Sequence, residues 1–170
     1  MFSKPVMAAN EVITDLELGM NFTFNNGYAK INVYRMLYLN EQLKNINLSQ
    51  EGEYSYYSAD STTHSGFEYE SKIFIDSNTT LGINGALQMN VFNNGNFLPN
   101  TPSSMMNISL SRNFSDNLQL FAHYKKIGGM YIDNIYSEDG YINSFGVLDL
   151  GIHTSWKIVN VSLKINNALN

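Results

Sequence analysis

The chain contains no cysteine, which excludes a disulfide scaffold and any metal or nucleophile site built on a thiol. It also has no run of about 18 apolar residues, so the sequence predicts no membrane-spanning helix. Charged residues make up only 15% of the 170 residues, and the net charge is -5. There is no basic patch, and we therefore expect no nucleic acid among the partners.

What the chain does have is a strict alternation of apolar and polar residues between Thr62 and Val91. Apolar side chains fall on odd positions on both sides of a turn at residues 76–78. This period of two predicts two antiparallel strands, each with one apolar and one polar face. Each run is about 12 residues long, whereas an ordinary strand has about 5–6. Tilted strands of about 9–11 residues cross a bilayer, so the hairpin is typical of a membrane β-barrel.

The same alternation recurs along the rest of the chain and predicts eight strands in all. Beyond this hairpin we expect strands at residues 11–24, 28–40, 102–114, 118–133, 144–156 and 159–166. Asn26-Gly27 lies in the first turn and is a strong hairpin signal. The expected fold is an all-β, antiparallel up-and-down transmembrane β-barrel of about eight strands.

The connections between these strands alternate in length. Short turns are expected at about residues 25–27, 76–78, 115–117 and 157–158, and long loops at Glu41–Ser61, Asn93–Thr101 and Asn134–Asn143. Bacterial outer-membrane barrels have short periplasmic turns and longer extracellular loops. A soluble β-sandwich with buried aromatics is the alternative, but it gives no reason to keep all long loops at one end.

The alternation also predicts which side chains face lipid. On the outer face we expect Leu18, Met20, Ile31, Val33, Ile83, Leu87, Ile108, Leu110, Leu150, Ile152, Val161 and Leu163. Arg35 falls on this face as an exception, which a bulge or an extended side chain reaching the interface would explain. Aromatic residues collect beside the short turns, where a periplasmic girdle is expected: Phe22, Phe24, Tyr28, Phe74, Phe114 and Trp156.

No catalytic constellation is present, and we expect neither an enzyme nor a resident cofactor. His64, His123 and His153 fall on the polar faces of different strands, which favours solvated side chains over a metal site. Glu68 and Glu70 could form a pair of acids, but we expect them to join polar networks with Lys72, Lys125 or Lys164.

The expected loop at Glu41–Ser61 is rich in tyrosine. Aromatic and polar groups on an external loop suit the capture of a ligand, so Tyr54, Tyr56 and Tyr57 are the candidate ligand-binding residues. Ordinary loop tyrosines are an equally good interpretation of the same residues.

Several short motifs follow one another along most of the chain. They are Glu17-Leu18-Gly19 before a hairpin, Gly66-Phe67-Glu68-Tyr69-Glu70, a segment with Gly95, Leu98, Pro99 and Pro102, an element with Gly128 or Gly129, Tyr131 and Asp133, and the final SLKINNALN. Each motif alone is weak. In this order and spacing, the series resembles the C-terminal part of the β-barrel of a TonB-dependent outer-membrane receptor.

This resemblance implies a single β-barrel segment over residues 1–170, about the last third of a 22-stranded barrel. The plug domain and the final strand of the family are absent, and residues 1–10 do not read as a signal peptide, so we expect a piece of a longer chain. The implied function is import of a ferric siderophore or similar scarce nutrient across the bacterial outer membrane. The implied partners are outer-membrane lipid, that chelate, and the TonB complex through the absent plug. The alternative is a small self-contained eight-stranded outer-membrane barrel with a structural or adhesion role.

Overall fold

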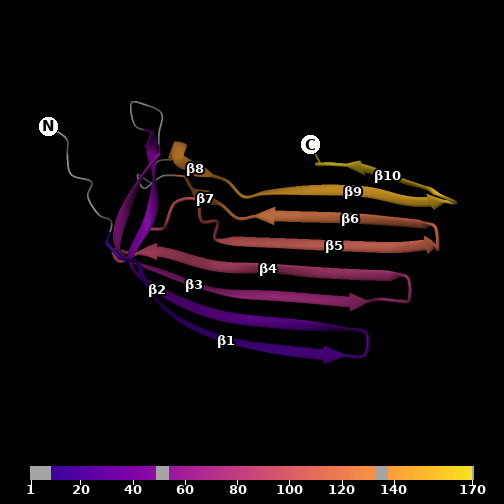
Figure 1. Ribbon diagram of the computed structural model, residues 1–170, viewed down its shortest axis with the longest axis horizontal. Coiled ribbons are helices and arrows are strands. Elements are labelled where there is room, and N and C mark those ends of the chain that lie inside the picture. The colour runs from indigo at the N-terminus through magenta and orange to yellow at the C-terminus, as the bar shows by residue number, and fades with distance from the viewer. Residues whose placement is uncertain (1–8, 49–53, 133–137, 170) are drawn as a thin grey trace.

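The computed structural model describes residues 9–48, 54–132 and 138–169. Eight long strands form one sheet (Figure 1): β1 (Val12–Phe24), β2 (Gly27–Leu48), β3 (Tyr54–Phe74), β4 (Thr79–Phe92), β5 (Ser104–Ser115), β6 (Leu118–Ile127), β9 (Phe145–Trp156) and β10 (Val159–Ile165). A separate small sheet pairs β7 (Met130–Tyr131) with β8 (Tyr141–Ile142), and the short 3-10 helix η1 (Glu138–Gly140) precedes β8. Among these described residues, no helix is long and apolar enough to cross a membrane.

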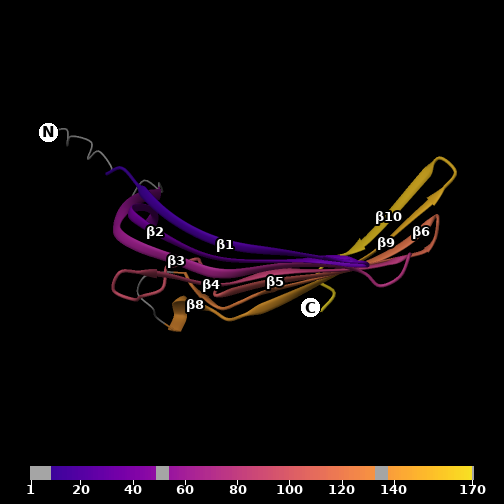
Figure 2. The same cartoon turned by 90° about the horizontal axis from the view of Figure 1, so that it is seen from below.

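The strands of the large sheet lie in the order β1-β2-β3-β4-β5-β6-β9-β10, each antiparallel to its neighbours. This up-and-down arrangement confirms the predicted all-β fold class. In the described part of the chain, β1 and β10 each pair with one neighbour only, so the sheet is open. Figure 2 shows that the sheet is a single curved layer. An open, curved, up-and-down sheet fits a segment of a barrel wall better than a closed eight-stranded barrel.

The register of the sheet places the predicted apolar residues on one face. Leu18 pairs with Val33, Val33 with Phe67, and Phe67 with Leu87, and directly paired residues share a face. All twelve residues of the predicted outer face fall in register on this side. Leu18 is 74% exposed, although a soluble sandwich would bury such a residue. The single layer therefore contradicts the sandwich alternative and leaves an apolar face suited to lipid.

One predicted connection is wrong. Residues 41–61 are largely strand rather than loop, because β2 continues to Leu48 and β3 begins at Tyr54. Glu41 pairs with Ala59, and Leu43 pairs with Tyr57. The alternation that reveals a strand arises where one face meets lipid, and it is lost where both faces meet water. The backbone ladder continues there without a periodic sequence pattern to mark it.

Three smaller expectations also need correction. The predicted strand 118–133 ends at Ile127, after which Gly128 and Gly129 separate it from β7. Tyr28 and Phe74 lie on the polar face rather than in an outer aromatic girdle, since they alternate with Ala29 and Ile73. Arg35 remains on the apolar face in an unbroken register between Leu16 and Ser65, so no bulge turns it inward.

Glycines on these strands make room for aromatic rings from the neighbouring strand. The ring of Tyr34 lies so close to Gly66 that a Cβ atom there would be 2.7 Å from the Tyr34 hydroxyl oxygen. Tyr69 covers Gly85 in the same way, 2.5 Å from the corresponding position. Each ring shields backbone that glycine would otherwise expose, a known stabilising device in β-sheets.

Candidate functional site: the polar face of the sheet

The face opposite the apolar one carries most of the polar side chains and forms an open hollow. Its volume is about 710 Å³. Side chains from six strands line it: Asn21, Lys30, Asn32, Glu68, Glu70, Asn84, Asn107 and Lys125. Strand alternation and register place them together, because residues two apart on a strand share a face, as do directly paired residues on neighbouring strands. In a closed barrel this face would line the interior.

A network on this face is built around Glu70, near the short-turn ends of β2 and β3. The Tyr28 hydroxyl donates to Glu70 Oε1 at 2.6 Å, and Lys30 Nζ lies 3.6 Å from Glu70 Oε2. Asn32 donates to Glu68 Oε2 at 3.4 Å. The two glutamates therefore join a polar network as predicted, although their partners come from β2 rather than from the predicted lysines. Lysine and carboxylate together give this surface both signs of charge at short range.

Two of the predicted lysine partners, Lys72 and Lys164, make other contacts. Lys164 Nζ lies 2.9 Å from Asp149 Oδ2, which ties β10 to β9. The Lys72 ammonium lies over the ring of Phe74, 5.4 Å from the centroid. Asn107 donates to Asn84 Oδ1 at 3.0 Å. Ion pairs on this face are thus local to neighbouring strands, and sequence spacing alone could not assign them.

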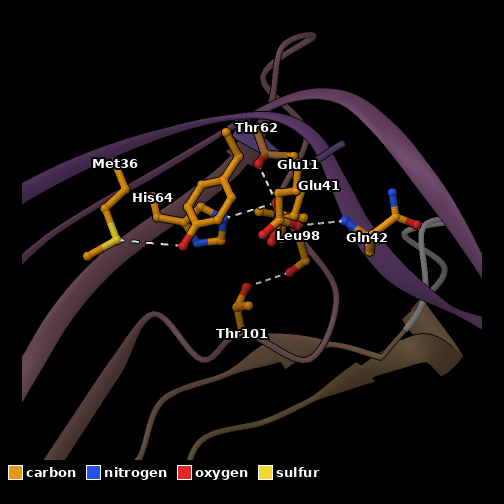
Figure 3. A network of polar contacts seen from close by, with 9 residues as sticks. Glu11, Met36, Glu41, Gln42, Thr62, His64, Leu98 and Thr101 are labelled. Carbon is orange, nitrogen blue, oxygen red and sulfur yellow. Dashed lines mark hydrogen bonds and ion pairs between the residues drawn. The ribbon is translucent and has the colours of Figure 1, made fainter. Parts of the chain in front are cut away.

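A second polar cluster lies where β2 and β3 leave the apolar zone (Figure 3). Glu41 accepts a hydrogen bond from the hydroxyl of Thr62, which is fully buried, and its Oε2 lies 3.1 Å from His64 Nε2. Glu41 would point to the other face in a regular strand, but Asn40 has a φ of 59° and interrupts the alternation. Tyr38 completes the cluster, with its ring centroid 4.8 Å from that of His64.

The Asn93–Thr101 connection folds back against this end of the sheet. Leu98 is 2% exposed, and its N–H donates to the carbonyl of Asn90 at 2.8 Å. The Thr101 hydroxyl donates to the Leu98 carbonyl at 2.6 Å (Figure 3). This connection is the predicted long loop, and the structure adds that it is packed on the sheet rather than extended into solvent.

The candidate ligand tyrosines lie on β3 and not on an external loop. Tyr54 pairs with Leu48, Tyr56 with Lys44, and Tyr57 with Leu43. Tyr56 is 67% exposed, whereas Tyr57 is half-buried. Adjacent residues of a strand point to opposite faces, so the side chains of Tyr56 and Tyr57 lie on opposite faces of β3.

The three histidines make separate contacts in the sheet. His64 contacts Glu41, His123 is paired with Asp149 across the β6–β9 ladder, and His153 stacks on Phe121 with ring centroids 5.0 Å apart. In the part of the chain that the structure describes, no group of three histidine or carboxylate side chains converges in a way that could hold a metal ion.

Sequence reasoning missed the contacts of three residues on the polar face: Tyr28, Glu41 and Asn90. Tyr28 follows a turn, and its position opposite Glu70 could be found only from the register. Glu41 lies in the segment predicted as loop. Asn90 belongs to a predicted strand, but its burial depends on a connection whose path the sequence does not indicate.

Comparison with families of known proteins gives a match over almost the whole chain. The family described as TonB dependent receptor-like, beta-barrel, matches residues 7–168. The chain belongs to this family. The TonB-dependent receptors are outer-membrane transport receptors rather than enzymes. No curated protein matches the chain.

Solved structures of siderophore and ferric-chelate receptors share the fold. The ferric enterobactin receptor of Pseudomonas aeruginosa has a TM-score of 0.75 and 16% identity, over 94% of this chain and 26% of that receptor. The ferric yersiniabactin uptake receptor of Yersinia pestis has a TM-score of 0.76 and 19% identity, over 94% and 25%. The siderophore receptor of Acinetobacter baumannii gives 0.73 and 13%, over 94% and 28%. The chain therefore spans about a quarter of the length of these receptors.

Proposed function

We propose that this chain forms part of the barrel wall of an outer-membrane TonB-dependent receptor that imports a ferric siderophore or a similar scarce nutrient. The observation that carries the proposal is the open sheet, with a continuous apolar face, a polar face, and edges at β1 and β10 that have no partner strand among the described residues. In the receptor we expect those edges to pair with further strands. Unpaired edges left in water or lipid would invite aggregation or leave backbone groups without hydrogen bonds.

The rest of the receptor would supply what this segment does not. We propose that residues 1–170 form one barrel segment, and that the plug domain, the contact with the TonB complex and the final strand belong to other parts of the protein. The solved structures that share this fold are about four times as long as this chain and are siderophore receptors. Their function supports a ferric siderophore or a similar nutrient as the imported compound. The connections that join β2 to β3, β4 to β5 and β6 to β9 would face the exterior, because alternate connections of a spanning sheet share one side.

Ligand contact by Tyr54, Tyr56 and Tyr57 is part of the same proposal. Tyr56 is the strongest candidate of the three tyrosines, because it is 67% exposed and lies far from the short turns. We expect Tyr56→Ala in the full-length receptor to weaken ligand binding more than Tyr57→Ala, whose side chain is half-buried. Equal binding by both variants and the wild-type receptor would remove the tyrosines from the site.

Uptake by living cells tests the function. A strain that lacks the gene and a complemented strain would be supplied with radioactive ferric enterobactin and ferric yersiniabactin under iron limitation. We expect energy-dependent uptake of a ferric chelate only in the complemented strain. A protein that fractionates with the outer membrane but transports no ferric chelate would contradict the siderophore class, and one that reaches another compartment would contradict the receptor.

The alternative, a small eight-stranded barrel with a structural or adhesion role, requires β1 to pair with β10. Those strands lie at opposite edges of the sheet, and no pairing joins them among the described residues (Figure 1). The open edges favour the receptor segment.

A further inference from the structure

A groove lies on the apolar face of the sheet, over β5, β6, β9 and β10, which lie side by side (Figure 1). Its volume is about 440 Å³. Its apolar walls include Leu110, Leu120, Leu150, Ile152, Leu163 and Ile165. The groove is separate from the open hollow of the polar face, because the two lie on opposite sides of the same strands.

A small residue, Ala122, forms the floor of the groove. Ala122 pairs with Leu110 on one side and with Leu150 on the other, and Leu150 pairs in turn with Ile165. Directly paired residues share a face, so a single methyl group lies in a row of larger apolar side chains. The apolar face is therefore lowest at Ala122, between leucines that can contact a hydrocarbon chain.

Arg112 lies at the short-turn end of the groove. Among the described residues that line the groove, it is the one that carries a charge. Its register partners are Thr79, the first residue of β4, and Leu120, and it lies two residues from Leu110 on the same face. β5 ends soon afterwards, at Ser115. In a spanning sheet this position is close to the lipid headgroups, whereas the apolar part of the groove continues toward the middle of the bilayer.

Neighbouring side chains position the guanidinium without using all its donors. Arg112 Nη1 donates to Thr79 Oγ1 at 3.2 Å and lies 3.8 Å from Asp76 Oδ2, and Arg112 Cζ lies 5.4 Å from the ring centroid of Phe114. The ion pair is long, since a charge-assisted hydrogen bond measures about 2.7–2.9 Å. The Asp76 carboxylate is already held by the N–H of Asn78 at 2.7 Å and by the Thr79 hydroxyl at 3.1 Å.

The remaining donors of Arg112 are accessible to an anion. Both polar contacts of its guanidinium within the described chain use Nη1, and the side chain is 53% exposed. A guanidinium presents its N–H groups as a planar fork that matches the oxygens of a phosphate. A phosphate at this end and a hydrocarbon chain over Ala122 are the two parts of a glycerophospholipid.

We propose that this groove holds an acyl chain of a glycerophospholipid whose phosphate binds Arg112. Charge complementarity favours a lipid that carries a phosphate over one that carries no charge. The inference rests on the proposed function for the side of the membrane, because short turns in the periplasm place Arg112 in the periplasmic leaflet. The groove and the arginine belong to the chain itself, so lipid binding can be measured apart from transport.

Native mass spectrometry of the purified full-length protein tests the proposal separately from uptake. The delipidated protein in detergent would be titrated with dioleoyl phosphatidylglycerol, or with dioleoylglycerol, which has the same acyl chains and no phosphate. We expect the Kd of the first bound phosphatidylglycerol to be about tenfold lower, as a hydrogen bond between charged groups implies. Equal Kd values for the two lipids would overturn the role of the phosphate, whether or not the receptor transports a ferric chelate.

Arg112→Gln removes the charge at the end of the groove. We expect the Kd for phosphatidylglycerol to rise about tenfold and the Kd for dioleoylglycerol to stay the same. Arg35→Gln is the matched control, because Arg35 is an exposed arginine on the apolar face of β2, away from the groove. An unchanged Kd in Arg112→Gln, or an equal rise in Arg35→Gln, would overturn the assignment of the phosphate to Arg112.

Ala122→Phe fills the floor of the groove and leaves Arg112 in place, so it also tests the proposal if Arg112→Gln does not assemble. We expect it to weaken the binding of both lipids, whereas Val33→Phe, on the same face outside the groove, should change neither. Unchanged lipid binding in Ala122→Phe, or an equal loss in Val33→Phe, would overturn the site. A dimer in the same spectra that Ala122→Phe disperses would assign the groove to a second copy of the chain, and would also overturn it.

Discussion

The ring of Phe121 covers the backbone of Gly151, its direct partner on the neighbouring strand. A Cβ atom on Gly151 would overlap three ring carbons of Phe121, and the same ring stacks on His153. The absence of a side chain at residue 151 is therefore what allows the two strands to carry this ring between them.

Gly151→Ala tests that relationship. We expect the free energy of unfolding in lipid vesicles to fall by about 1–3 kcal/mol, because the ring must move out of its stacked position. Gly19→Ala is the matched control on β1, where the new methyl group would have its nearest neighbour, Asn32 Oδ1, at an ordinary 3.4 Å. The control should change stability by less than about 0.5 kcal/mol. Equal effects of the two substitutions in urea titrations would show that the ring does not require the glycine.

The assignment of the two faces is tested by one pair of adjacent residues on β4. Ile83 pairs with Ile108 on the apolar face, and Asn84 points to the polar face. Ile83→Arg should lower stability in lipid by about 2–4 kcal/mol, because the charge would lie within the bilayer. Asn84→Arg should have a much smaller effect. A larger loss for Asn84→Arg in vesicle unfolding experiments would reverse the assignment of the faces.

The cluster around Glu41 is tested by another adjacent pair. Thr62 is fully buried and donates to Glu41, while Thr63 lies on the opposite face. Thr62→Val keeps the shape but leaves the carboxylate short of a donor, which should cost about 1–3 kcal/mol. Thr63→Val should be close to neutral. A Thr62→Val variant as stable as wild type in urea titrations would show that the cluster contributes little.

Asp76, in the turn between β3 and β4, makes stability depend on pH. The N–H of Asn78 donates to its carboxylate at 2.7 Å, and this bond, with smaller contributions from Thr79 and Arg112, holds the pKa of Asp76 below its usual 3.8. The stabilisation is therefore present above pH 3.8 and is lost as the pH falls through the lower folded pKa. We expect Asp76→Asn to be less stable than wild type at about pH 7, and the difference to shrink as the pH falls below 3.8 and through the lower folded pKa. A stability difference that does not change with pH would contradict this role.

The sequence was most informative where lipid and water meet the two faces of one strand. Alternation around Ile83 and Ile108 predicted the strands, their faces and the short turns that join them, because burial in lipid imposes a period of two on the side chains. Where β2 and β3 extend beyond that zone, the same ladder continues through Leu43 and Tyr57 without any alternation. Propensity and pattern give no signal there, so the segment was predicted as loop.

The polar face could be predicted as a surface but not as a set of contacts. Strand alternation places Glu70 and Lys30 on one face once the register is known. Which lysine becomes the ion-pair partner of Glu70, Lys30 or Lys72, depends on strand pairing. Glu41 turns to the same face because Asn40 adopts a left-handed conformation. The neighbouring sequence does not predict that conformation. The burial of Asn90 requires the path of a connection that only tertiary packing determines.

Surface labelling of single cysteines in intact cells tests most directly whether this chain is part of an outer-membrane barrel. The chain itself has no cysteine, so Tyr56→Cys and Asn117→Cys would each introduce one exposed thiol into it, at opposite ends of the sheet. A membrane-impermeant maleimide should react with Tyr56→Cys in intact cells, and with Asn117→Cys only after the outer membrane is opened. Equal labelling of both thiols in intact cells, or the reverse pattern, would contradict a sheet that spans the outer membrane with its short turns in the periplasm.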